Sequence, residues 1–143
     1  MKVVLMSIKE EHNANIERGA KKSELRTMPP KLEPPFKVVT YESGILGRHK
    51  VVNEWICKKM TRYRMCMGVP AHLVKTACVS AEYIRRYSGE GYKDITEMEI
   101  SDLVVYDRPR ELSEYFRVDR FGNLQGSVKH PPQNWIYVED YNA

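Results

Sequence analysis

The chain has 143 residues and a mass of 16.7 kDa, which is the size of one ordinary domain. Hydrophobic residues make up 42% and charged residues 29%, which is a globular composition and excludes wholesale disorder. No apolar run approaches the ~18 residues of a membrane span, and the apolar run at the N-terminus is too short for a signal peptide. Three cysteines without a CxxC pair argue against a disulfide framework and a four-ligand zinc site. We therefore expect one domain over residues 1–143, a cytoplasmic location without membrane contact, free thiols, and no metal or cofactor.

The formal net charge of +4 is too small to indicate nucleic-acid binding by itself, but its distribution is uneven. Residues 1–69 hold 14 Lys and Arg against 7 Asp and Glu, whereas residues 70–143 hold 9 against 12. This asymmetry favours one electropositive face that could meet phosphate. An uneven solvated surface explains the same counts equally well.

The N-terminal residues predict a strand followed by a short helix. Residues 2–7 form an apolar run typical of a buried strand. The pattern from Ser7 to Glu10 fits a capping box, in which Ser7 bonds the backbone and Glu10 reaches back. We expect the helix to end near Gly19, where a left-handed residue costs little. Every fourth residue of this segment is expected to face the core: Ile8, His12 and Ile16.

Beyond this helix, short strands of uneven length alternate with loops and small helices. Strand-like patterns cover residues 23–27, 36–41, 50–67, 95–106 and 134–139. Residues 28–35 hold four of the eight prolines and should form an irregular surface loop. The pattern becomes helical over residues 70–87, where Ser80 caps a second helix. On the first of these two helices, Ala71, Val74 and Cys78 are expected to share one face. The elements predict an α+β fold, built as a small β-barrel with peripheral short helices.

The most specific segment is residues 19–26, whose sequence GAKKSELR fits the pattern GxKxxExR. If this segment is extended, Glu24 and Arg26 lie two positions apart and point to the same face. A carboxylate and a guanidinium on one face can pair and can present hydrogen-bonding groups to a polar ligand. Lys21 lies three positions before Glu24, so it joins them only if the chain bends after the helix. Taken alone, the residues favour a solvated strand edge over a binding cleft.

The motif, placed after a strand and a short helix, resembles the ASCH domain family. Four later segments resemble this family in the same order: residues 51–57, 79–87, 100–113 and 131–138. The resemblance implies a PUA-like small β-barrel and a polar cleft lined by Lys21, Glu24 and Arg26. It also implies a function in binding RNA or a nucleotide, because the family includes RNA-binding modules.

The same family includes nucleases and small amidohydrolases that act on acetylated cytidine, so the resemblance also implies a hydrolase as the alternative. In those amidohydrolases the motif lysine is the nucleophile, assisted by a threonine and by a glutamate further along. Here Lys21 is in place, but Glu24 stands at the position of the threonine. Glu24 could instead be a general base, with Lys21 and Arg26 stabilising an oxyanion. The further glutamate has two candidates, Glu97 and Glu99.

A second basic segment, residues 58–64, places four cations around one tyrosine. Cations that contact phosphates beside an aromatic ring that stacks on bases are typical of single-stranded nucleic-acid sites. On a regular strand Lys58, Arg62 and Arg64 would share one face, and Tyr63 would point to the other. We expect this stripe to lie on the approach to the cleft, although Tyr63 could equally belong to the core.

The remaining reactive side chains give no further motif. The four histidines are scattered without metal-binding spacing, and His12 fits packing or a pocket wall better than catalysis. Cys57 lies in an apolar strand and is expected to be a buried, inert thiol. The leading hypothesis is thus an RNA- or nucleotide-binding domain, with Lys21 and Glu24 as catalytic residues only if the protein is an enzyme. The sequence leaves that choice open and gives no positive sign of a protein partner.

Overall fold

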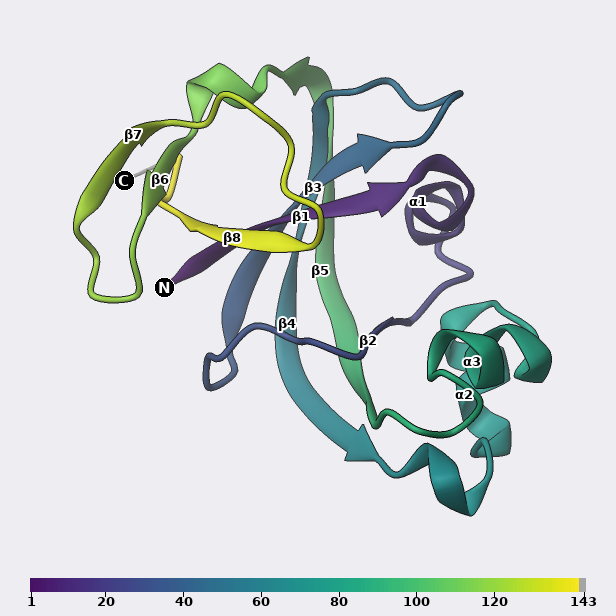
Figure 1. Ribbon diagram of the computed structural model, residues 1–143. Coiled ribbons are helices and arrows are strands. Elements are labelled where there is room, and N and C mark those ends of the chain that lie inside the picture. Colours follow the sequence, from purple (N-terminus) through teal and green to yellow (C-terminus); the bar gives the residue numbers. More distant parts are fainter. Residues whose placement is uncertain (142–143) are drawn as a thin grey trace.

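The computed structural model describes residues 1–141, which form one mixed sheet with short helices at one end (Figure 1). The strands are β1 (Val3–Lys9), β2 (Ser23–Arg26), β3 (Phe36–Ser43), β4 (Val51–Tyr63), β5 (Ile95–Arg110), β6 (Phe116–Val118), β7 (Leu124–Ser127) and β8 (Trp135–Val138). The α-helices are α1 (Glu10–Glu17), α2 (Ala71–Ala77) and α3 (Ala81–Tyr87), with 3-10 turns at Met65–Met67 and Leu112–Glu114.

The strands follow the order β2-β5-β4-β3-β1-β8-β6-β7 in a single eight-stranded sheet. β1 pairs with β3 in parallel, and the other neighbouring strands pair antiparallel. β1 is buried on both faces, since successive residues such as Val4 and Leu5 point to opposite faces and belong to two different hydrophobic clusters. This burial explains why the N-terminal run is continuously apolar rather than alternating.

The mixed α+β class is confirmed, but the predicted closed barrel is wrong. Within residues 1–141 the edge strands β2 and β7 do not pair, so the sheet stays open. β2 is only four residues long and is followed by the proline-rich segment 28–35, where four residues lack a backbone donor. Side chains instead connect β2 to β1 and β8. We call this boundary the seam.

Three contacts define the seam. Arg26 Nη2 donates to the backbone oxygen of Ser7 at 2.9 Å. Asn134 Nδ2 and Trp135 Nε1 both donate to the backbone oxygen of Met28, at 3.0 and 2.9 Å. The end of β2 is thereby held against β1 and β8 without a backbone ladder, which leaves room for a site between them.

A third hydrophobic cluster positions the helices beside β2. Leu73 and Ala77 of α2 and Ile84 of α3 pack against Leu25 of β2 and Ile95 of β5. Each of the four larger aliphatic side chains contributes about 1.5–3 kcal/mol when fully buried. Because successive strand residues alternate in direction, burying Leu25 against α2 turns Glu24 and Arg26 to the opposite side of β2.

Several local predictions are confirmed. The first helix ends as expected, because Arg18 follows its last turn and Gly19 adopts a left-handed φ of 79°. Ser80 caps α3, since its hydroxyl accepts from the backbone N–H of Tyr83 at 3.0 Å. Cys57 is fully buried, and this burial raises the pKa of its thiol to about 11.

Other local predictions are wrong. Ser7 does not cap α1: it lies in β1 and donates its hydroxyl to Pro132 O at 2.6 Å, while Lys9 precedes the helix without a side-chain cap. The buried face of α2 carries Leu73 and Ala77, and Val74 is partly buried against the same cluster. The short strands β6 and β7 were not predicted. Among residues 1–141, no helix is long and apolar enough to cross a membrane.

Candidate functional site

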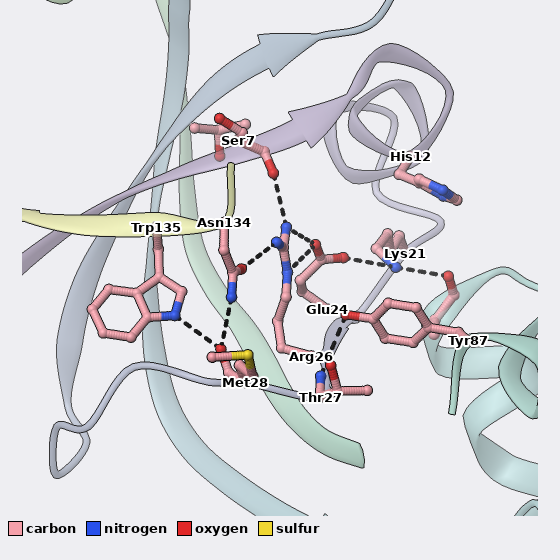
Figure 2. A network of polar contacts seen from close by, with 12 residues as sticks. Ser7, His12, Lys21, Glu24, Arg26, Thr27, Met28, Tyr87, Asn134 and Trp135 are labelled. Carbon is pink, nitrogen blue, oxygen red and sulfur yellow. Dashed lines mark hydrogen bonds and ion pairs between the residues drawn. The ribbon is translucent and has the colours of Figure 1, made fainter. Parts of the chain in front are cut away.

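A pocket of about 190 Å³ opens at the seam, between α1, β2 and α3. Its polar lining comes mainly from β1, α1, β2 and α3 with their flanks, and Ser43 and Gln133 complete it: Ser7, Lys9, His12, Lys21, Glu24, Arg26, Ser43, Tyr83, Tyr87 and Gln133. The three residues of the GxKxxExR motif all belong to this lining. Figure 2 shows these motif side chains converging from the β2 segment beneath His12 and beside Tyr87.

Glu24 is the centre of the motif cluster. One of its oxygens, Oε2, accepts from Arg26 Nε at 3.1 Å and from Arg26 Nη2 at 2.7 Å. The other, Oε1, lies 3.3 Å from Lys21 Nζ. Lys21 and Glu24 are only 4% and 7% exposed. The predicted pairing of Glu24 with Arg26 is thus confirmed, and the alternative of a solvated strand edge is wrong.

Lys21 reaches this cluster through the bend that the sequence required. The left-handed Gly19 turns the chain, and the backbone N–H groups of Ala20 and Lys21 both donate to Asn15 O, at 3.0 and 2.9 Å. The Lys21 ammonium also donates to Ala77 O at 2.8 Å, at the end of α2. Helix α2 therefore fixes the lysine from one side while Glu24 holds it from the other.

Arg26 supports the cluster and spans the seam. Besides Glu24 and Ser7 O, its guanidinium binds Asn134 Oδ1 through Nη1 at 2.7 Å. These contacts occupy four of the five N–H donors of the side chain. The remaining Nη1 hydrogen has no partner among residues 1–141. On Glu24, three of about four lone-pair positions are occupied, which leaves one on Oε1. The free acceptor on Oε1 lies on the Lys21 side of the carboxylate, whereas the free donor on Nη1 lies at Asn134, on the far side of the guanidinium (Figure 2).

Electrostatics fix the charge of the carboxylate. Burial acts to raise the pKa of Glu24, but the charges of Arg26 and Lys21 and their hydrogen bonds outweigh it and hold this pKa below its usual value. Burial is also the main cause that lowers the pKa of His12, so its imidazole is neutral at pH 7. The floor of the pocket thus carries one anion between two cations.

Aromatic side chains form the wall opposite this floor. Tyr83 and Tyr87 lie one turn apart on α3 with ring centroids 6.2 Å apart and planes inclined by 20°. Tyr83 also meets His12 edge-on, with ring centroids 5.5 Å apart. The Tyr87 hydroxyl accepts from the Thr27 backbone N–H at 3.3 Å, which ties α3 to the end of β2. Both tyrosines remain partly open, at 43% and 37% exposure.

The structure does not bring the second basic segment to this pocket. Lys58 pairs with Asp102 at 3.0 Å, and Arg62 pairs with Asp94 at 2.8 Å. Arg64 is exposed after the end of β4, and none of the three cations lines the pocket. Their role in contacting nucleic acid stays a prediction.

The two candidates for a further glutamate also lie outside the pocket lining. Glu97 is buried on the α2 side of β5, where Thr76 donates to it at 2.9 Å and Tyr63 at 3.3 Å. Glu99 pairs in the sheet with Ser23, the residue next to Glu24.

Sequence reasoning missed two parts of the site. The first is the wall of Tyr83 and Tyr87, for which a signal existed: they are four residues apart in a helix whose start was correctly predicted. The second is the support of Arg26 by Ser7 O and Asn134. These residues are 19 and 108 positions away in the chain, so no local pattern could have revealed them.

Comparisons with known proteins agree with the fold. No protein-family model matches the sequence, and no curated protein matches it either. The crystal structure of ASCH from Zymomonas mobilis is similar over 96% of this chain and 88% of its own, with a TM-score of 0.75 and 18% identity. A Tyr-to-Phe mutant of the Zymomonas mobilis protein gives a TM-score of 0.73 at 17% identity, covering 99% of this chain and 93% of that one. A Ser-to-Ala mutant gives 0.75 at 19% identity, covering 98% and 90%. The chain therefore has the ASCH fold, as the sequence resemblance predicted.

Proposed function

We propose that this protein binds RNA or a nucleotide by holding one base in the pocket at the seam. The observation that carries the proposal is an ionised, buried carboxylate opposite two partly exposed tyrosines. Bases offer hydrogen-bonding edges and flat faces, and sites for single-stranded RNA combine polar groups for the edge with aromatic rings for the face.

The free groups on the floor specify the kind of base. Glu24 Oε1 has one acceptor position left, which suits an exocyclic amine. Arg26 Nη1 has one donor left, but it lies at Asn134, on the side of the guanidinium away from Glu24. Cytosine and adenine carry an exocyclic amine, whereas uracil has none. We therefore expect cytosine and adenine to be preferred over uracil.

The size of the pocket supports a single ring system. The pocket volume of about 190 Å³ is larger than a cavity of ~150 Å³ that binds benzene. It is smaller than the ~300 Å³ at which pockets for drug-sized ligands begin. The ASCH fold gives independent support, since the family that the sequence resembles includes RNA-binding modules.

The direct test is a titration of labelled single-stranded RNA homopolymers with wild-type protein and with the Glu24→Gln variant. We expect wild type to prefer the cytosine and adenine polymers and Glu24→Gln to lose this preference, because an amide presents a donor as well as an acceptor. Glu33→Gln, on the exposed proline-rich loop, is the matched control and should bind as wild type does. Tyr87→Leu should weaken all four polymers, which tests the wall without changing the buried charges. Equal binding of all polymers by wild type and Glu24→Gln would refute the base pocket.

The contacts of Lys21 and Glu24 weigh against the hydrolase alternative. A lysine nucleophile needs a nitrogen lone pair that is free to reach the substrate, but Lys21 Nζ donates to Ala77 O and lies 3.3 Å from Glu24 Oε1, so it is already held by two acceptors. Glu24 is a weak base because two cations lower its pKa. Metal-independent hydrolysis of acetylated cytidine or of RNA, lost in Lys21→Met, would nevertheless overturn this assignment in favour of a hydrolase.

A further inference from the structure

Three hollows on the surface adjoin one another around a single side chain, Tyr83. Besides the base pocket, Tyr83 lines a groove of about 520 Å³ on α3, together with Ser80, Glu82, Arg86 and Tyr87. On its other side it lines a hollow of about 220 Å³ between α1 and the start of α3, together with His12 and Asn15. We call these two the α3 groove and the α1 groove. The base pocket shares Tyr87 with the first and His12 with the second, so each groove adjoins it, and the two grooves meet each other at Ser80 and Tyr83.

The partition between the base pocket and each groove is aromatic. Tyr83 and His12 separate the base pocket from the α1 groove, with the Tyr83 hydroxyl 3.3 Å from His12 Nε2. Tyr83 and Tyr87 separate it from the α3 groove. Successive bases of a single strand stack on aromatic side chains of this kind, and such stacking tolerates any base because every base has a flat face.

The α3 groove also carries a charge suited to a backbone phosphate. Arg86 lies at the groove with 72% of its side chain exposed and reaches Glu82 at 2.9 Å. An exposed pair of this kind is weak, so the guanidinium can turn to a phosphate at little cost. The base pocket itself contributes Lys9, an exposed cation at its mouth.

Resting on the function proposed above, we infer that the ligand is a continuous single strand of RNA and not a free nucleoside. The base pocket takes the central base of a trinucleotide, and the two neighbouring bases lie in the α1 groove and the α3 groove. The pocket supplies base preference, whereas the grooves supply affinity without preference, because stacking and phosphate contacts carry little base information.

The experiment is a length series measured by calorimetry: cytidine monophosphate, then oligocytidylates of two, three and five nucleotides. A trinucleotide whose two outer nucleotides lack bases is the decisive control, since it keeps the phosphates and removes the stacking. We expect the affinity to rise at least about fivefold for each added base up to three nucleotides, the low end of base stacking on aromatic side chains, and then to level off. The abasic trinucleotide should lose most of that gain.

A pair of variants tests the protein side of the same inference. Arg86→Gln should weaken the trinucleotide, whereas Arg117→Gln, on exposed β6 and outside all three hollows, should not. If the trinucleotide binds no more tightly than cytidine monophosphate, or the abasic control binds as well as the intact one, the inference is overturned and the base pocket stands. If no RNA of any length binds, the proposed function and this inference fall together.

Discussion

The buried charges of the motif predict an unusual order of stabilities among its variants. In the native protein Glu24 lies between Lys21 and Arg26, whose side chains are only 3% and 12% exposed. Glu24→Gln leaves two buried cations beside each other without a counter-charge. Removing one partner of a buried ion pair costs about 3–5 kcal/mol. Because Arg26 keeps its bonds to Ser7 and Asn134, we expect the lower end of this range, about 3 kcal/mol.

Lys21→Met should cost less, although it also removes a buried charge. It leaves Arg26 and Glu24 as a pair of zero net charge with two hydrogen bonds, and it removes the bond to Ala77 O and the contact to Glu24 Oε1, together worth about 2 kcal/mol. The double variant Lys21→Met/Glu24→Gln removes one of the two uncompensated cations. It should therefore be more stable than Glu24→Gln alone by at least about 1 kcal/mol, a coupling typical of residues in one network.

Urea unfolding at pH 7 gives the free energy of unfolding of the wild type, the two single variants and the double variant. The slope of this free energy against urea concentration shows whether unfolding remains two-state. A loss of about 3 kcal/mol corresponds to a fall in Tm of roughly 10 °C for a chain of this length. A shared buried network is refuted if Lys21→Met is as unstable as Glu24→Gln, or if the double variant loses the full sum of the two single losses. Either result would mean that the three groups do not share a buried electrostatic network.

Three further expectations concern acid stability, salt and thiol reactivity. Hydrogen bonds from Arg48 hold the pKa of Glu42 at about 2, below its usual 4.5, so the stability it contributes is complete above pH 4.5 and is lost as the pH falls towards 2. Glu42→Gln should flatten the pH dependence of the urea midpoint over that range. A midpoint that falls with acid as steeply in the variant as in the wild type would contradict this. RNA affinity should fall with salt by a log–log slope of roughly −0.7 per phosphate contact, and replacing Arg62 and Arg64 by Gln should flatten the slope if they contact the strand. Cys57, buried and with a pKa of about 11, should react with a thiol reagent at pH 8 only after unfolding in urea.

The strands and the motif pairing were accessible to sequence reasoning because their causes are local. β1 and β3 are runs of apolar residues whose length matches a strand, and the prolines of segment 28–35 mark an irregular connection. Glu24 and Arg26 share a face because strand residues alternate, whatever the sheet does elsewhere. The bend that brings in Lys21 needed only a glycine after a helix.

The parts that sequence reasoning missed depend on contacts between distant segments. The open sheet follows from which strand ends meet, and β6 and β7 are too short to carry an alternating pattern. The stripe predicted for residues 58–64 assumed a regular strand, yet the pairing of β4 with β5 shifts register between Cys57 and Met60. Such an irregularity changes which side chains share a face, and only the partner strand shows it.

The open sheet and the pocket have the same physical origin. A closed ladder between β2 and its neighbours across the seam would satisfy the backbone with strand-to-strand bonds and bring the chains to about 4.8 Å, too close for a ligand. Here the backbone oxygens of Ser7 and Met28 are satisfied by the side chains of Arg26, Asn134 and Trp135 instead. Side chains are longer than a backbone hydrogen bond, so they hold the strands apart while still stabilising the fold. Arg26 thus has two roles that cannot be separated: it replaces the missing ladder, and it keeps Glu24 ionised in the space that the missing ladder leaves.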